Sequence, residues 1–334
     1  MESNTTNLII DNSTEQEDLK MMDTVITIIK VNLIFFPTVG CYGNINILIA
    51  TYKNKSLHNK CSYLICQLAF WNNFNLMFEL LSGIRLLTDA AEMTRRDCFS
   101  SIAFYLFCEC MGTSMILSIA VDRLLSIVFP FRDDKWNQNF YLLIMTTPGI
   151  IYACIMVGSN WILMDDGWVI VCNPPAAYTR ELSDIWTKVT MVFCALSIFV
   201  YTVIYYLFWK MAKDAKGFSV QRKIVTTLSI NVIFVFVSSI LCAGLMFVVN
   251  NFMNLRPMVV EAIEAFAVIP GLAAYTCYYF VLFWRSTEYR NAFLHQLKCQ
   301  CFQSNKKQRE NTIAVNMTMS GRTTMGKRNS RQII

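Results

Sequence analysis

The sequence predicts an all-α membrane protein built from seven membrane-spanning helices, and its composition is the first reason. Hydrophobic residues make up 55% of the 334 residues and charged residues 16%, whereas soluble domains average about 45–50% and about 25%. The mean hydropathy is +0.40. A soluble core cannot absorb this much apolar surface, and the same composition excludes a disordered, coiled-coil or collagen-like chain.

The second reason is a series of long apolar runs. About 20 helical residues cross the roughly 30 Å hydrocarbon core of a membrane, and tilt accommodates runs that are somewhat longer. Seven runs reach this length: 24–52, 61–88, 98–128, 139–163, 185–211, 222–249 and 258–284. The first 23 residues are polar and acidic, unlike a signal peptide. We therefore expect an extracellular tail over 1–23, a seven-helix domain with a cytoplasmic helix over 24–297, and a disordered cytoplasmic tail over 298–334.

The distribution of Lys and Arg predicts the orientation, because cytoplasmic loops are enriched in these residues. Three fall in 53–60, three in 123–138, five in 210–223 and ten from residue 285 onward, which places 21 of the 29 on one side. That side is expected to be cytoplasmic, with the N-terminus outside and the C-terminus inside the cell.

Features of the predicted outer face agree with this orientation. Asn4 and Asn12 begin Asn-x-Ser/Thr triplets in the N-terminal tail, where a lumenal glycosylating enzyme would reach them. Cys98 at the start of the third run and Cys172 after the fourth fall on the same side, where an oxidising compartment permits a disulfide. The alternative is two unrelated thiols.

Several classes of function find no support in the sequence. The net charge of +6 is modest, and the basic residues lack the interleaved aromatic side chains that stack on bases, so no nucleic-acid partner is expected. Most of the thirteen cysteines lie singly within apolar runs, without the spacing of a zinc site. HExxH, GxSxG and Walker patterns are missing, so we expect neither an enzyme nor a cofactor.

A motif at the cytoplasmic end of the third run is the most informative part of the sequence. The stretch Ala120–Pro130 resembles the Asp-Arg-Tyr segment of rhodopsin-like G-protein-coupled receptors. Gly43-Asn44 and Leu68-Ala69 match that superfamily's anchors in the first and second spans. Ser286–Phe293 resembles its short cytoplasmic helix. The resemblance implies a rhodopsin-like bundle in which the two outer-face cysteines form the superfamily's disulfide.

Two longer stretches, Gly43–Ile65 and Phe280–Arg290, resemble the nematode serpentine receptor class sx family, and this resemblance runs through nearly all of residues 25–297. It implies a chemosensory receptor that transmits an extracellular signal to an intracellular heterotrimeric G protein. The ligand stays open between a small molecule and a peptide. The implied location is the plasma membrane, including the sensory cilium.

The predicted G-protein-coupling residues are Asp122, Arg123, Ile127 and Pro130. In the resembling superfamily the Arg contacts the G protein once the sixth span swings outward, and the Asp restrains it beforehand. An Arg at a helix end can also be a simple interfacial anchor. The stretch Lys216–Lys223 contains no acid to hold Arg123, so we expect measurable basal signalling.

The chain departs from the superfamily at its switch positions. Asn72 stands where an Asp is usual, and Gly112 where a Ser helps hold sodium. A neutral amide does not compensate for the free-energy cost of dehydrating a sodium ion. We therefore expect no sodium site, and we expect Asn44 and Asn72 to be structural polar residues. Residues 278–282 replace the Asn-Pro-x-x-Tyr motif, and 237–240 lack the Trp and Pro of the sixth span. Activation must use other packing contacts, or the chain signals poorly.

Two acids inside the predicted spans suggest a ligand pocket, because an intramembrane acid is costly and commonly functional. Glu109 precedes Arg123 by 14 residues, about 21 Å along a helix, which places it in the outer half, where the resembling superfamily binds ligands. Tyr105 occupies the place of the Asp that amine receptors of the superfamily use, which argues against an amine ligand held in that way. The alternative is that both acids are protonated or hydrogen-bonded to polar neighbours. The expected pocket residues, for a basic or hydrogen-bonding ligand, are Glu79, Tyr105, Glu109, Lys188 and Glu264.

The end of the chain suggests membrane attachment. Cys299 and Cys301 follow the short cytoplasmic helix, where cysteines are commonly palmitoylated. Basic residues beyond them favour contact with anionic membrane lipids.

Two other functions compete with the receptor. A non-signalling or accessory protein of the same fold would fit the altered switch positions. A seven-span channel or transporter fits less well, because the predicted orientation is opposite to that of chemosensory seven-span channels and no internal repeat of the kind found in transporters is visible.

Overall fold

The computed structural model describes residues 2–88, 92–129, 137–169, 172–211, 219–252, 266 and 268–297. Within them, long helices dominate and one short antiparallel ribbon pairs β1 with β2. In chain order the elements are α1 (Glu2–Lys53), η1 (Lys55–Leu57), α2 (Lys60–Leu87), β1 (Met93–Thr94), α3 (Arg95–Val128), α4 (Gln138–Leu163), β2 (Trp168–Val169), α5 (Pro174–Ala177), α6 (Arg180–Met211), α7 (Ser219–Phe252), α9 (Val268–Arg285) and α10 (Thr287–Leu297).

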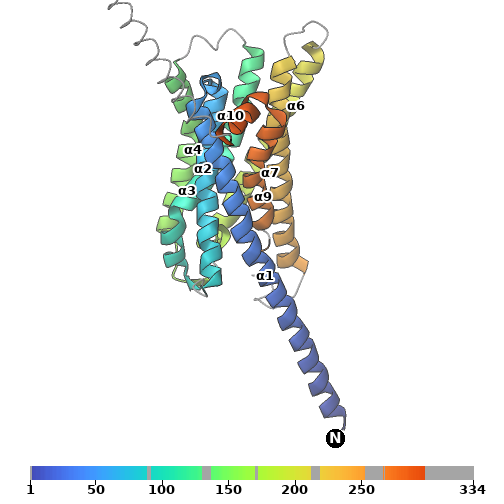
Figure 1. The fold of residues 1–334 in the computed structure, drawn as a ribbon. Helices are drawn as coiled ribbons and strands as arrows, with labels where there is room; N and C mark the ends of the chain where they lie inside the picture. Colours follow the sequence, from blue (N-terminus) through green and yellow to red (C-terminus); the bar gives the residue numbers. More distant parts are fainter. Residues whose placement is uncertain are drawn as a thin grey trace, which may run out of the picture.

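The long helices form one closed bundle (Figure 1). α1 packs on α2, α2 on α3, and α3 on both α4 and α6. α6 packs on α7, α7 on α9, and α9 returns to α1, which closes the ring. Because α3 also contacts α5 and α7, it is the central helix of the bundle.

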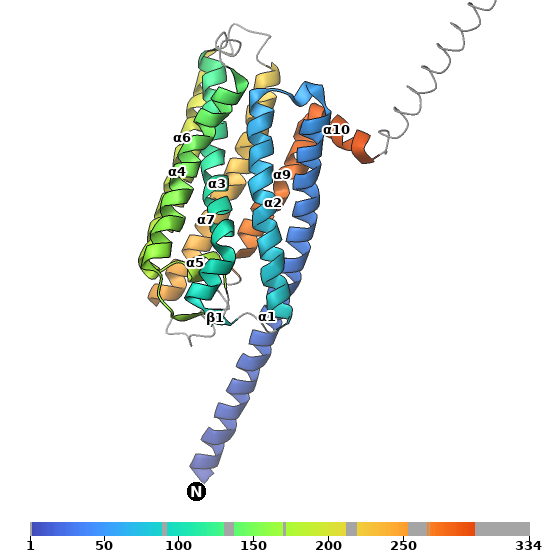
Figure 2. The same cartoon turned by 90° about the vertical axis from the view of Figure 1, so that its left-hand side faces the viewer.

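The two ends of the bundle differ. Figure 2 shows β1 at one end, here called the ribbon end, and α10 at the opposite end, here called the α10 end. The N-terminal part of α1 extends beyond the ribbon end (Figure 1). The ribbon and α10 therefore identify opposite faces of the membrane domain.

The predicted seven-helix bundle is confirmed, but α1 begins at Glu2, 22 residues before the predicted start of the first span, so residues 2–23 of the expected tail continue this helix. Apart from the start of the seventh helix, the other described helix ends shift by at most five residues. α3 and α6 begin at Arg95 and Arg180, three and five residues before the predicted starts of their spans. The seventh helix, α9, is described from Val268, while 258–265 lie outside the described residues. The short helix after the seventh span is α10.

Five of the helices, α1, α3, α4, α6 and α7, contain a segment long and apolar enough to cross a membrane. α2 is less apolar because it buries polar residues, among them Asn72, Asn75 and Glu79. Apolar side chains also cover the outside of the bundle; Ile162 is 83% exposed and Trp284 76% exposed. Such a surface suits lipid and would be costly in water.

Polar side chains cap the starts of several helices. The Asn59 side chain caps α2 by accepting a hydrogen bond from the Ser62 backbone N–H at 2.9 Å. Thr94 caps α3 by accepting from the Asp97 N–H at 3.1 Å. These side chains satisfy N–H groups that the first helical turn leaves unpaired.

Small residues allow α1 to approach its neighbours closely. A Cβ atom at Gly43 would lie 2.6 Å from the Tyr279 Cβ of α9. A Cβ atom at Gly40 would lie 2.6 Å from both Leu76 Cδ1 on α2 and Thr276 Oγ1 on α9. Close helix packing at small residues replaces the hydrophobic driving force that lipid removes.

We expect Gly43→Ala to destabilise the bundle by about 1–3 kcal/mol, because the added methyl group forces α1 away from Tyr279. Thermal unfolding of the purified protein measures this. Gly158→Ala on α4 is the control, because a Cβ there meets nothing within 4 Å. Equal stability of the two variants would contradict the close approach.

Candidate functional site

The α10 end of α3 contains an ion pair between the buried Asp122 and the partly buried Arg123. Arg123 Nε donates to Asp122 Oδ2 at 2.8 Å, and Arg123 Nη2 bonds to the same oxygen. The Asp122 residue is 1% exposed, and its backbone carbonyl accepts from Ser126 Oγ at 2.9 Å. A partly buried guanidinium needs such a partner because lipid offers none.

A tyrosine on α4 holds the other side of the carboxylate. The buried Tyr141 hydroxyl donates to Asp122 Oδ1 at 2.7 Å. Lys60 Nζ, at the start of α2, lies 5.1 Å from the centroid of the Tyr141 ring, within the range of a cation–π contact. Tyr141 thus connects α4 to Asp122 on α3 and to Lys60 on α2. No local pattern points to Tyr141, because its pairing with Asp122 depends on how two helices face each other.

The surroundings of Arg123 contain no second acid among the described residues, where its ion pair is with Asp122. Ile127 is 3% exposed and packs in the main hydrophobic core. Pro130 and the loop over 212–218 lie outside the described residues, and so do the side chains of 219–223. Among the described residues, Asp122 on α3 holds Arg123 directly, and Tyr141 on α4 holds Asp122.

The middle of the bundle contains neutral amides. Asn72 and Asn75 are 4% and 0% exposed, and both polar atoms of the Asn75 side chain lack a hydrogen-bond partner among the described residues. A Cβ at Gly112 would be 3.4 Å from Asn72 Oδ1. Asn44 Nδ2 donates to the Tyr275 carbonyl at 3.5 Å. The amides of Asn72 and Asn75, and no carboxylate among the described residues, lie next to Gly112.

An internal cavity of about 20 Å³ lies beside these amides. This volume is enough for a single water molecule. Its polar lining consists of Asn72, Asn231, Tyr201, Tyr275 and Tyr278. Because Tyr275 also bonds to Glu109, the cavity adjoins the acids described next.

Two acids lie toward the ribbon end of the bundle. Glu79 on α2 is 4% exposed and accepts a hydrogen bond from the Tyr105 hydroxyl of α3. Glu109 Oε1 accepts from the Tyr275 hydroxyl of α9 at 3.4 Å. Glu109 Oε2 is buried and has no hydrogen-bond partner among the described residues. The structure thus brings the three predicted pocket residues Glu79, Tyr105 and Glu109 together, and adds Tyr275.

Further polar groups gather next to Glu109. The hydroxyls of Tyr152 on α4 and Tyr178 after α5 lie near the Cys110 thiol, yet neither forms a hydrogen bond of good geometry within the described residues. Tyr178 is 1% exposed, and its ring centroid is 6.0 Å from that of Trp186. Tyr178 belongs to a loop, so no helical periodicity indicated that it would be buried.

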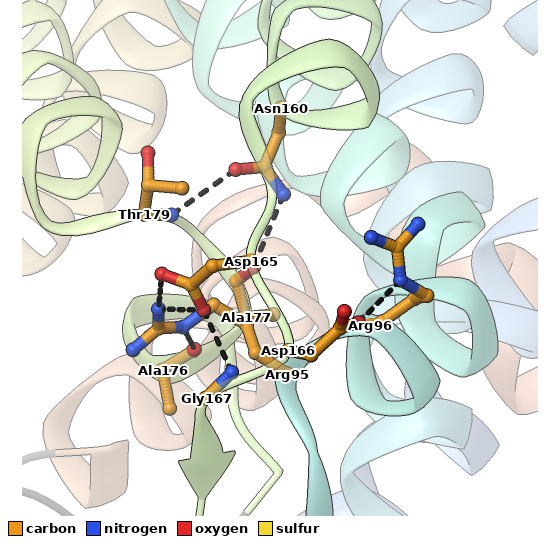
Figure 3. A network of polar contacts seen from close by, with 9 residues as sticks. All are labelled: Arg95, Arg96, Asn160, Asp165, Asp166, Gly167, Ala176, Ala177 and Thr179. Carbon is orange, nitrogen blue, oxygen red and sulfur yellow. Dashed lines mark hydrogen bonds and ion pairs between the residues drawn. The ribbon is translucent and has the colours of Figure 1, made fainter.

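The segment between α4 and α6 is fixed to the ribbon end. Cys98 and Cys172 form the predicted disulfide, with their Cα atoms 5.4 Å apart. Asn160, 0% exposed, donates to the Ala177 carbonyl and accepts from the Thr179 N–H, both at 3.1 Å (Figure 3). These contacts hold the residues on either side of Tyr178 inside the bundle.

Ion pairs add to this attachment. Arg95 bonds to both carboxylate oxygens of Asp165, and its Nε donates to the Ala176 carbonyl at 3.1 Å (Figure 3). Arg96 pairs with Asp166. Both acids are well exposed, and exposed ion pairs contribute only about 0–1 kcal/mol each. The buried Asn160 bonds are therefore the stronger noncovalent attachment.

The remaining predicted site residues lie elsewhere. Lys188 is exposed on α6 and has no described contact with either acid. Glu264, Cys299 and Cys301 lie outside the described residues. The side chains of the predicted glycosylation sites Asn4 and Asn12 also lie outside the described part of the chain.

We expect Asn160→Ala to destabilise the protein by about 2 kcal/mol, because it leaves the Ala177 carbonyl and the Thr179 N–H buried without a partner. Thermal unfolding in detergent measures the loss. Asn139→Ala serves as the control, because Asn139 is exposed on the same helix. A similar loss in both variants would show that the Asn160 contacts are unimportant.

Comparison with known proteins identifies the class of this bundle. Residues 37–297 match the family described as serpentine type 7TM GPCR chemoreceptor Srsx. The mouse protein named Probable G-protein coupled receptor 45 is 25% identical over 164 residues, which cover 47% of this chain and 43% of the relative. Its human counterpart is 26% identical, over 49% and 44% of the two chains.

A relative from Xenopus laevis, the High-affinity lysophosphatidic acid receptor, is 24% identical over 195 residues, which cover 55% of this chain and 49% of the relative. The match thus spans less than half the length of each of these relatives. The family match is broader, because it covers the bundle from α1 through α10. The chain therefore belongs to the serpentine chemoreceptor family Srsx, and it is an integral membrane G-protein-coupled receptor rather than an enzyme.

Proposed function

We propose that this chain is a plasma-membrane chemoreceptor that binds an extracellular ligand toward the ribbon end and activates a heterotrimeric G protein at the α10 end. In this proposal the ribbon end faces outward, as the distribution of Lys and Arg predicts. The observation that carries it is the arrangement around Arg123. Its partly buried charge is held by Asp122 and, through Asp122, by Tyr141.

The mechanism follows from which helices make these contacts. Asp122 is held from α3 and α4, and no acid of the described part of α7 pairs with Arg123. Outward movement of α7 therefore breaks no described ion pair. A ligand that favours the open arrangement shifts the equilibrium by its difference in affinity for the two states.

The proposed ligand site is centred on Glu79, Tyr105 and Glu109. The Xenopus relative is named for lysophosphatidic acid, which is an anionic lipid. Two acids without a basic partner would repel an anionic head group. We therefore propose that this chain recognises a different chemical class of ligand.

Arg123→Ala should abolish G-protein nucleotide exchange in membranes that display the receptor, including the basal exchange that we expect because the stretch Lys216–Lys223 has no acid to hold Arg123. Surface expression must be matched between variants. Arg96→Ala is the control, because it makes the same chemical change at the ribbon end and should leave exchange close to wild type. Mock-level exchange in wild type and variant, with and without conditioned extract of the source organism, would favour the non-signalling alternative.

Tyr141→Phe should raise basal exchange by up to about tenfold, because ionised Asp122 loses a charge-assisted hydrogen bond and releases Arg123 more readily. Tyr52→Phe is the control, because Tyr52 is 83% exposed. The same exchange assay measures both variants. Unchanged or lower basal exchange in Tyr141→Phe would contradict a restraining role for this tyrosine.

A further inference from the structure

We propose that Glu79 and Glu109, here called the acid pair, bind the head group of a protonated primary amine. This inference rests on the proposed function only for the side from which the ligand arrives. It concerns the charge and the hydrogen-bond donors of the ligand, which the receptor family leaves open.

The first argument is the charge balance around the acid pair. The two carboxylates lie near enough to repel each other, and both act on the hydroxyls of Tyr105 and Tyr275. None of the described salt bridges involves either acid. Arg85, a basic residue later on α2, instead donates to Ser101 Oγ at 3.2 Å. Burying two carboxylates as like charges without a cation is costly, so each is held either as the neutral acid or as the counter-ion of a positively charged occupant.

The second argument is the set of unused hydrogen-bonding atoms. Glu109 Oε2 is buried without a donor among the described residues, although Glu109 as a whole is only half-buried. The Tyr178 hydroxyl, in a residue that is 1% exposed, is also unpaired and lies within electrostatic reach of Glu109. The Tyr152 hydroxyl also lacks a hydrogen bond of good geometry among the described residues and lies within electrostatic reach of Glu109. The two hydroxyls come from α4 and from the loop after α5, and they lie near the Cys110 thiol, which follows Glu109 on α3.

The third argument selects the kind of cation. A metal ion requires several oxygen, nitrogen or sulfur ligands, and the described residues contain no group of three or more His, Cys, Asp or Glu side chains suited to one. A quaternary ammonium has no N–H to give to Glu109 Oε2 or the tyrosine hydroxyls. A primary ammonium has three donors, enough for Glu109 and the hydroxyls around it. Phe78, stacked on Tyr105 at 5.7 Å, provides an apolar surface for the carbon part of such a ligand.

The test measures thermal unfolding of the purified full-length receptor in detergent with increasing ethylammonium chloride. Tetramethylammonium chloride at equal ionic strength is the matched salt, because it has the same charge and no N–H donor. A ligand that binds the folded state raises the unfolding temperature in a saturable way. We expect ethylammonium, and not tetramethylammonium, to do so.

Three variants locate the effect. Glu109→Gln should raise the half-maximal ethylammonium concentration by about tenfold or more, as expected for the loss of a charge-assisted hydrogen bond. Glu79→Gln and Tyr178→Phe should raise the half-maximal ethylammonium concentration by smaller factors. These two variants keep the test valid if Glu109→Gln does not fold. Glu288→Gln on α10, which is exposed, is the control and should behave as wild type.

Equal effects of the two salts, no saturable effect in wild type, or an unchanged effect in the acid-pair variants would overturn the proposal. The measurement needs no G protein. A receptor that binds ethylammonium without nucleotide exchange would contradict the proposed signalling function and leave the amine site intact. A receptor that couples to its G protein but does not bind ethylammonium would contradict the amine site and leave the proposed signalling function intact.

Discussion

The lack of hydrogen-bonding partners in lipid is the constraint on which the arrangement of α3 depends. This helix carries the Asp122–Arg123 ion pair near one end and the acid Glu109 toward the other. Each of these groups costs several kcal/mol in the hydrocarbon region unless the protein supplies a partner. The partners come from three different helices. Tyr141 on α4 bonds to Asp122, and Tyr275 on α9 bonds to Glu109. Glu79 on α2 accepts a hydrogen bond from Tyr105 of α3. α3 can satisfy all of them only from the centre of the bundle.

The sequence was most informative where the physical rule is local. Apolar runs of membrane length predict the spans, and the helix that begins at Thr287 was expected from its own residues. The disulfide between Cys98 and Cys172 followed from the resemblance and from the side on which both residues fall. The intramembrane position of Glu79 and Glu109 made them candidates for a polar site, and the structure brings them together with Tyr105.

The sequence was least informative where two distant segments have to face each other. Tyr141 and Asp122 meet because of the rotation of α4 against α3, and neither helix encodes that rotation in a form that hydropathy reveals. Asn160 looks like an ordinary polar residue near a helix end, yet it is 0% exposed and holds two backbone groups of the following loop. The three-to-five-residue shift in the starts of α3 and α6 has a similar origin, because polar first turns continue helices beyond the apolar run.

The attachments of the loop between α4 and α6 make the bundle mechanically uneven. A disulfide joins this loop to α3, and Asn160 joins it to the end of α4, so α3, α4 and α6 are linked near the ribbon end. The described polar contacts of α7 are single hydrogen bonds, such as Ser238 to the Pro270 carbonyl at 2.9 Å and Tyr205 to Ser229 at 2.9 Å. A load on this loop is therefore shared between α3 and α4 at the ribbon end.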